Sequence, residues 1–235
     1  MNVVHFNIFK RISYNLKTII RIFIGHYYQF YRLIIGRSAK KKKLLFSRDT
    51  DIVIEGFPRV GNTFFVVAFQ KLSEKKLTIA HHVHLTCQIK EALASKKPII
   101  VLVRDPIDAV VSLKIREPRI SIYVALFWYL QFYSFALKHK ARIEIKFFSS
   151  FISNYNEIAI KGFRFKESIN LKDDDIFSQI NEINRKEDNE KANNDLAVSM
   201  PTEEKEKRKR EIMGNFNSNT WLAQKCSKVY EELIK

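Results

Sequence analysis

The chain has 235 residues, of which 46% are hydrophobic and 28% are charged. This size and composition fit one globular domain with short additions, and they exclude a chain that is disordered throughout or that spans a membrane many times. The net charge of +16 favours anionic partners, a class that includes nucleotide phosphates, nucleic acids, acidic glycans and anionic lipids.

Residues 1–48 form a basic, amphipathic N-terminal extension. The stretch from Thr18 to Gly36 is apolar, but Arg21, His26 and Arg32 interrupt it, so it does not qualify as a transmembrane span. The extension also lacks the small-residue cleavage pattern of a secretory signal. We therefore expect a helix that either lies on an anionic membrane surface, as a peripheral contact at the inner face, or packs against its own domain.

From residue 49 onward the pattern is that of an α/β domain. Asp51–Glu55 predicts a short buried strand, Gly56–Gly61 a turn, and Asn62–Leu72 an apolar helix. Strands and helices continue to alternate, which predicts a central parallel sheet flanked by helices in a single domain, 49–235. The later predicted elements are a strand or strand end at Thr78–Leu85, helices at Gln88–Ala94, Pro106–Lys114 and Ser121–His139, and strands at Pro98–Val103 and Arg142–Phe148.

The C-terminal third begins with a polar, highly charged segment. Residues 170–200 predict a mobile loop or a weakly held helix, because they are polar and charged. A charged helix follows Pro201, and apolar residues at helical spacing predict a last helix at Trp221–Ile234.

A glycine-containing loop joins the first predicted strand to the first predicted helix. Its residues Gly56 to Thr63 (GFPRVGNT) match G-x-x-x-x-G-x-T, in which backbone N–H groups and the helix N-terminus wrap an anion. Gly61 permits close approach and Thr63 adds a hydroxyl donor. ATP- and GTP-binding loops need a lysine where this chain has Asn62, and a cation stands instead at Arg59, which disfavours an ordinary kinase or NTPase.

A second candidate anion site follows the strand that ends at Val103. The sequence from Arg104 to Ser112 (RDPIDAVVS) puts an arginine at the carboxyl end of the strand, where ligands of open α/β sheets bind. The guanidinium of Arg104 suits a phosphate group, and Ser112 supplies a hydroxyl donor. Taken alone, the motif is also explained by a salt-bridged helix start with a proline in its first turn.

Together the two motifs resemble those of the PAPS-dependent sulfotransferases of the P-loop, bacterial-like type, where PAPS is 3′-phosphoadenosine-5′-phosphosulfate. The resemblance extends over Asp51 to Phe151. It implies PAPS as co-substrate, its desulfated product PAP, a hydroxyl acceptor and no metal. It also implies contacts with the 5′-phosphosulfate by the first loop and with the 3′-phosphate by the second motif. The residues carried over are Pro58, Arg59, Val60, Gly61, Asn62 and Thr63 for the first and Arg104 and Ser112 for the second.

The resemblance weakens toward the C-terminus. Lys205 and Lys209 follow Pro201 at a spacing seen in bacterial-type members, which implies assistance to the 3′-phosphate, although a solvated charged helix explains them equally well. Many members have an aromatic residue followed by glutamate after the last predicted strand of the sheet, whereas this chain has Phe147 to Ser150 (FFSS). The acceptor pocket is therefore less defined than the nucleotide site.

A histidine cluster lies between the two motifs. Sulfuryl transfer to an alcohol requires removal of the acceptor proton, and a histidine followed by leucine in this interval resembles the family's general base. This implies that His84 is the base and that Arg59 stabilises the leaving group, with His82 as the second candidate. Strand alternation would put His82 and His84 on one face, but no further ligand spacing supports a metal site. Packing or solvated histidines remain the simpler alternative.

Three functional hypotheses follow. The first is a sulfotransferase acting on a carbohydrate or lipid-linked glycan, the second a kinase-like P-loop enzyme, and the third a noncatalytic or degenerate P-loop nucleotide-binding protein associated with membrane or nucleic acid. We expect no nucleic-acid partner, because no helix-turn-helix or RNA-stacking motif is present. Cys87 and Cys226 have no CxxC spacing, which favours a reducing, cytoplasmic location.

Overall fold

The computed structural model describes residues 8–35, 42–165, 176, 178–180, 182, 203–214, 216–217 and 220–235. The loop predicted at 170–200 lies outside the described residues, except for 176, 178–180 and 182.

A four-stranded parallel sheet forms the centre of the fold, in the order β2-β1-β3-β4. This confirms the predicted α/β architecture. Every residue of β1 and β3 is buried, as expected for strands covered on both faces. The register sets Gly56, the last residue of β1, beside Leu102 of β3, so the loops that follow these two strands are neighbours. The strands are β1 (Ile52–Gly56), β2 (Ile79–His81), β3 (Ile99–Val103) and β4 (Glu144–Phe147).

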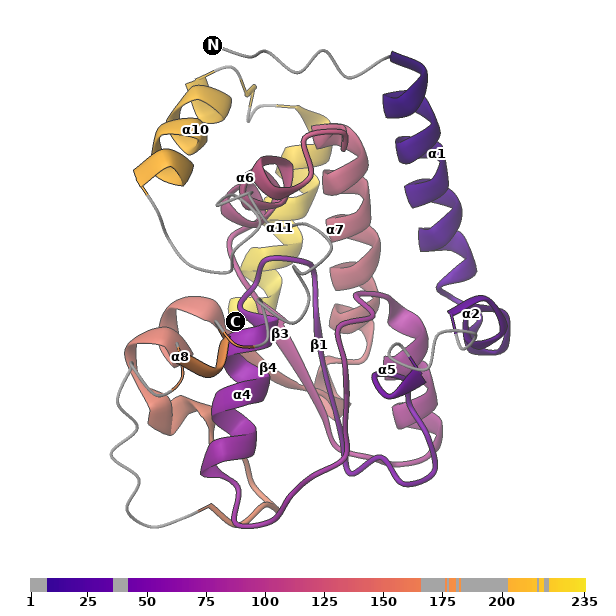
Figure 1. Cartoon of the computed structure of the whole chain (residues 1–235), viewed down its shortest axis with the longest axis vertical. Coiled ribbons are helices and arrows are strands. Elements are labelled where there is room, and N and C mark those ends of the chain that lie inside the picture. The colour runs from indigo at the N-terminus through magenta and orange to yellow at the C-terminus, as the bar shows by residue number, and fades with distance from the viewer. Residues whose placement is uncertain are drawn as a thin grey trace.

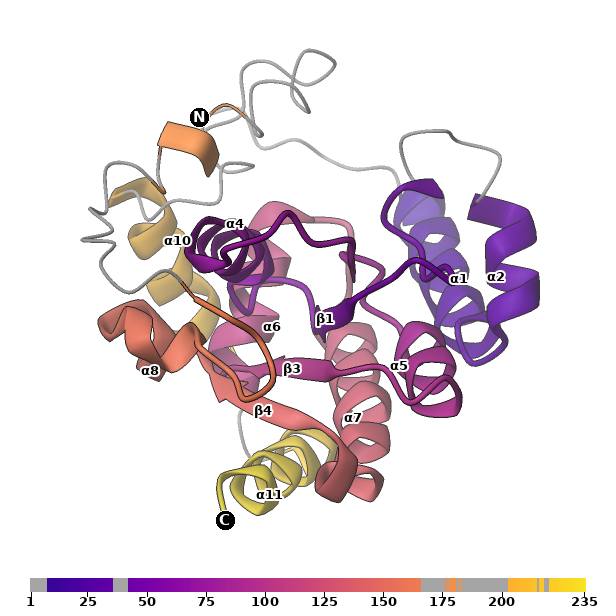
Figure 2. The same ribbon diagram turned by 90° about the horizontal axis from the view of Figure 1, so that it is seen from below.

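Helices cover the sheet on both sides. In Figures 1 and 2, α4 and α8 lie on one side of the strands, and α5 and α7 lie on the other. The buried Tyr129 and Tyr133 of α7 donate hydrogen bonds to the carbonyl oxygens of Arg104 and Leu102 at 2.8 and 2.6 Å, which fixes α7 at the end of β3. The helices are α4 (Asn62–Leu72), α5 (Thr86–Ala94), α6 (Pro106–Arg116), α7 (Ile122–Lys138), α8 (Phe148–Ser153), α10 (Glu203–Gly214) and α11 (Trp221–Ile234), with 3₁₀ turns η1 (Lys140–Arg142) and η2 (Tyr155–Ile158).

The N-terminal extension forms two helices where the sequence predicted one. Helix α1 (Ile8–Ile24) ends before a turn at Gly25, and α2 (Tyr28–Ile35) then runs in a new direction. A Cβ atom on Gly25 would lie 2.7 Å from a methyl carbon of Leu85, so glycine is needed where the chain meets the loop before α5. The continuous apolar pattern therefore gives two helices joined by a turn at a glycine that no larger residue could replace without a shift.

Two predicted strands are shorter than expected. The strand predicted at Thr78–Leu85 is limited to the three residues of β2, and the one predicted at Arg142–Phe148 begins at Glu144 and ends at Phe147. Phe148 instead starts α8. In both cases the residues past the end of the strand lie beside the predicted phosphate loop.

Candidate active site

The loop between β1 and α4 has the backbone geometry of an anion cradle. Gly61 caps the N-terminus of α4 in the left-handed region, with φ 86° and ψ 19°. A Cβ atom there would lie 2.9 Å from Cδ2 of Phe148. Arg59 also has a positive φ, 72°, an uncommon conformation for a residue with a side chain. The loop therefore passes twice through left-handed conformations, the kind of backbone from which anion-binding N–H concavities are built.

Arg59 joins the two predicted phosphate motifs. Its Nε donates a hydrogen bond to Oγ of Ser112 at 3.3 Å, and its carbonyl oxygen accepts one from Nη1 of Arg104 at 3.2 Å. Burial, followed by the charges of Arg116 and Arg104, lowers the pKa of Arg59 to about 10. The guanidinium thus stays protonated at neutral pH, and residues 53 positions apart in sequence meet at one site.

Asn62 and Thr63 differ from each other in what they contact. The buried Asn62 donates from Nδ2 to the carbonyl oxygen of Phe57 at 3.0 Å, so it braces the loop from within. Thr63 shares a hydrogen bond of 3.0 Å between Oγ1 and Nε2 of His82. The sequence predicted that both residues contact the ligand; Nδ2 of Asn62 is used within the loop, whereas its buried Oδ1 has no hydrogen-bond partner among the described residues.

Arg104 lies at the carboxyl end of β3 and is held on several sides. Its guanidinium carbon stands 4.5 Å from the ring centroid of Phe148, and its Nη2 is 3.7 Å from Asp108. Nε of Arg104 is buried with no hydrogen-bond partner among the described residues. A buried donor without a partner is costly, and an anionic ligand at this position would satisfy it.

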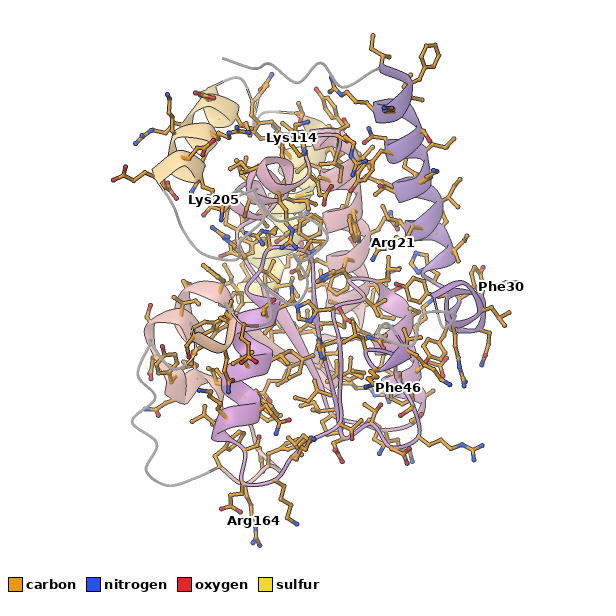
Figure 3. The ribbon with its side chains drawn as sticks, viewed as in Figure 1. Arg21, Phe30, Phe46, Lys114, Arg164 and Lys205 are labelled. Atoms are coloured by element: carbon orange, nitrogen blue, oxygen red, sulfur yellow. The ribbon has the colours of Figure 1, made fainter. Side chains whose placement is uncertain are left out.

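The charged helix predicted after Pro201 is present as α10, and it brings Lys209 to this region. Nζ of Lys209 lies 2.8 Å from Oδ1 of Asp108, the carboxylate that also faces Arg104. Lys205 is buried, and it lies at the same end of the molecule as Lys114 of α6 (Figure 3). Asp108 was not singled out from the sequence, although its position four residues after Arg104 was a usable signal.

His82 and His84 do not lie on a strand. The strand β2 ends at His81, and both His82 (φ 60°) and His84 (φ 59°) have left-handed backbones. The prediction that strand alternation puts them on one face is therefore wrong. Their rings still come together, with centroids 5.7 Å apart, because the chain bends back on itself after the strand.

His84 is oriented by the end of β1. Its Nδ1 lies 2.8 Å from the carbonyl oxygen of Gly56. Because a carbonyl can only accept, Nδ1 carries the proton and Nε2 is the unprotonated nitrogen. Burial lowers the pKa of His84 to about 3, which keeps the ring neutral. The carbonyl oxygen of His84 accepts a hydrogen bond from Nε1 of Trp128 at 2.9 Å.

Glu55 holds the loop that carries His82 and His84, a role that the sequence pattern did not predict. Its fully buried carboxylate accepts hydrogen bonds from the backbone N–H groups of Val83 and His84, each at 2.9 Å, and from Nε2 of Gln88 at 2.7 Å. Burial raises the pKa of Glu55 to about 7. A single acidic residue inside an otherwise apolar strand was the signal that could have revealed it.

The site as a whole is cationic. Arg59 and Arg104 meet there, and the charge of Arg116 acts on Arg59 and on both His82 and His84. Within the described ranges, no cluster of three or more His, Cys, Asp or Glu side chains is arranged to hold a metal ion. Such a site can bind a polyanion, place a neutral imidazole beside it and stabilise negative charge on a departing oxygen.

No family model matches the sequence, and no curated protein matches it. Among solved structures, the chain is similar to the mouse sulfotransferase SULT7A1 complexed with PAP, at 11% sequence identity and a TM-score of 0.34. That similarity covers 80% of this chain and 91% of the mouse chain. Because these values are low, the function is inferred from the residues of this chain.

Proposed function

We propose that this chain transfers a sulfuryl group from PAPS to a hydroxyl acceptor. The observation that carries the proposal is the junction at Arg59, whose side chain contacts Ser112 while its carbonyl oxygen holds Arg104. A phosphate loop without its lysine, joined to a second cationic site, suits a nucleotide that carries one anionic group at the 5′ position of its ribose and another at the 3′ position. The substrate of an ordinary NTPase has no 3′-phosphate and so offers no ligand for the second site.

The residues present fit such a donor. The left-handed loop at Gly61 and the start of α4 would hold the 5′-phosphosulfate. Arg104, whose buried Nε has no partner in the part of the chain that the structure describes, would hold the 3′-phosphate together with Ser112. Lys209 lies across Asp108 from Arg104. Lys205, which lies one helical turn before Lys209 on α10, is the second lysine proposed to assist the 3′-phosphate.

The proposed reaction moves one proton and one sulfuryl group. Nε2 of His84 takes the proton of the acceptor hydroxyl as the acceptor oxygen forms a bond to sulfur. The bond between sulfur and the bridging phosphate oxygen breaks, and its electron pair leaves on that oxygen. Arg59 and the loop N–H groups stabilise the charge that develops there.

In the free protein, burial is the largest cause of the low pKa of His84, about 3, and the charges of Arg21 and Arg116 lower it further. Such a weak base needs its pKa raised before it can take the acceptor proton. A bound polyanion offsets the surrounding arginine charges, and opposite charge nearby raises the pKa of a histidine. Glu55, 4.0 Å from Nδ1 of His84, would further stabilise the imidazolium after proton transfer. Glu55 is therefore a positioning residue.

For the acceptor we propose a carbohydrate or lipid-linked glycan hydroxyl. The support is the basic, amphipathic character of the N-terminal extension, which packs beside the histidine loop. The nitrogen Nη2 of Arg21 in α1 donates to the carbonyl oxygen of Val83 at 2.9 Å.

A transfer assay tests the proposal. The full chain would be incubated with sulfur-labelled PAPS and a panel of glycan and lipid-linked acceptors. We expect label in at least one acceptor, loss of at least about a hundredfold in rate for His84→Gln, and no change for His139→Gln at the end of α7. Equal transfer by wild type and His84→Gln would remove His84 as the base.

A further inference from the structure

An apolar stripe runs along the outer face of the N-terminal helices. On α1 the exposed side chains of Phe9, Ile12, Leu16, Ile20 and Phe23 recur every three or four residues, the spacing that puts residues on one side of a helix. The opposite side of α1 faces the protein, where Thr18 and Ile22 are buried. The stripe is therefore a largely exposed apolar face on a helix that packs against the domain through its other side, and at its end the ring of Phe23 also contacts Phe127, with centroids 6.0 Å apart.

The stripe continues beyond the turn at Gly25. Tyr27, Phe30 and Leu33 are exposed in the same way, and Phe30 points away from the body of the molecule in Figure 3. Figures 1 and 2 show α1 and α2 together at one edge, on the opposite side of the sheet from α8 and α10. Nothing else in the described part of the chain presents so many large apolar side chains in one row.

An open groove deepens this apolar face. It has a volume of about 440 Å³ and lies between α1 and the start of α7. Ile12 and Leu16 of the stripe line it, and Arg11 and Ser121 contribute polar atoms. A groove with apolar walls and a cation at its side suits an acyl chain whose headgroup is anionic.

The charged side chains of the N-terminal segment are all basic. The first 48 residues contain eleven lysines and arginines and no aspartate or glutamate, and the net charge of the whole chain is +16. Lys10 and Lys17 are exposed on α1 beside the stripe, and Arg32 is exposed on α2. Basic side chains flanking an apolar row favour a surface that is both apolar and anionic, and each contributes near a charged bilayer.

We propose that the face formed by α1 and α2 docks on an anionic lipid bilayer, with the apolar stripe inserted at the headgroup boundary and the basic side chains among the headgroups. The described residues contain no helix that is long and apolar enough to cross a membrane, so the helices lie along the surface. A second copy of the chain is disfavoured as the occupant, because two such faces would bring two strongly basic segments against each other.

The docked helices are tied to the rest of the protein by polar contacts. Asn15 of α1 donates to the carbonyl oxygen of Arg119 at 3.0 Å and accepts from the N–H of Ser121 at 2.7 Å. His26 shares a hydrogen bond of 2.9 Å with Thr86 at the start of α5. Membrane binding through α1 and α2 would therefore hold the whole domain at the bilayer surface, because these helices are packed against the domain and are not a flexible tether.

Vesicle binding by the full chain tests the proposal without any nucleotide, so its result is independent of the proposed transfer reaction. The probes are vesicles of phosphatidylcholine alone and of phosphatidylcholine mixed with phosphatidylglycerol. We expect strong binding to the mixed vesicles, weakened by salt, and little binding to the neutral ones. The double variant Leu16→Glu with Phe23→Glu should bind roughly a hundredfold more weakly.

Two further variants complete the test. Lys10→Glu with Lys17→Glu should lower affinity roughly thirtyfold, and Trp221→Glu, at an exposed apolar residue on α11, should leave it unchanged. Because all these positions are exposed, unchanged circular dichroism is expected to show that the variants fold. The proposal is overturned if the Leu16→Glu and Phe23→Glu double variant binds the mixed vesicles with wild-type affinity. It is also overturned if the wild-type chain binds no vesicles and instead self-associates, and the double variant abolishes that self-association.

Discussion

Replacing Gly61 by alanine perturbs the loop between β1 and α4 at a residue that has a left-handed conformation. At φ 86° an alanine costs about 1–2 kcal/mol in the left-handed region. Its Cβ atom would also lie 2.9 Å from Phe148 and 3.0 Å from Phe151, which adds about 1 kcal/mol of overpacking. We expect Gly61→Ala to lower the free energy of unfolding by about 2–3 kcal/mol, measured by urea denaturation.

A matched glycine separates the two contributions. Gly162 has φ 93°, and no described atom lies within 4 Å of the position that a Cβ atom would take there. Gly162→Ala should therefore cost only the left-handed conformation, about 1–2 kcal/mol. Gly61→Ala should also weaken PAP binding by at least about tenfold because the loop must shift, whereas Gly162→Ala should not. Equal unfolding free energies and equal PAP affinities for the two variants would refute this account of the loop.

Three more predictions concern elements around the site. Asp105→Ala removes the cap whose Oδ1 accepts from the N–H groups of Ile107 and Asp108 at 2.9 Å and should cost about 1 kcal/mol in urea denaturation; no loss would contradict the capping role. Arg21→Gln, which breaks the bond to Val83, should lower the Tm by about 2–4 °C in calorimetry, and an unchanged Tm would mean that the contact is not stabilising. Because the pKa of His84 is lowered from 6.5 to about 3, its contribution to stability is complete above pH 6.5 and is lost as the pH falls toward 3. Between pH 6.5 and 5, wild type should therefore lose about 2 kcal/mol more unfolding free energy than His84→Gln, and parallel losses would count against a buried neutral histidine.

Local sequence patterns were enough to predict the sheet and the strand–turn–helix unit around Gly61. The strand at residues 51–55, the turn at Gly56–Gly61 and the helix at Asn62–Leu72 agree with β1 and α4 to within a residue. An apolar run and a glycine-containing turn are properties of neighbouring residues, so periodicity captures them. The uncharged run at residues 98–103 likewise predicted the buried strand β3.

Contacts between distant residues were not predictable in the same way. The left-handed conformations of His82 and His84 depend on hydrogen bonds from this loop to Glu55, which lies on another strand. The requirement for glycine at position 25 comes from the closeness of Leu85, sixty residues away in sequence. The bracing role of Asn62 follows from the path of its own loop. Each of these features is set by tertiary packing, which overrides local preference.

The central claim is that the site recognises a nucleotide with both 5′- and 3′-anionic groups, and calorimetric titration with PAP, AMP and ATP in the absence of magnesium tests it most directly. We predict that PAP binds at least about tenfold more tightly than AMP, and that Arg104→Ala removes this difference. The side chain of Arg164 lies at the far end of the molecule from Lys114 and Lys205 in Figure 3. The variant Arg164→Ala should therefore leave the difference between PAP and AMP affinity unchanged. Equal affinity for PAP and AMP in the wild-type chain would contradict the donor site and with it the proposed transfer reaction.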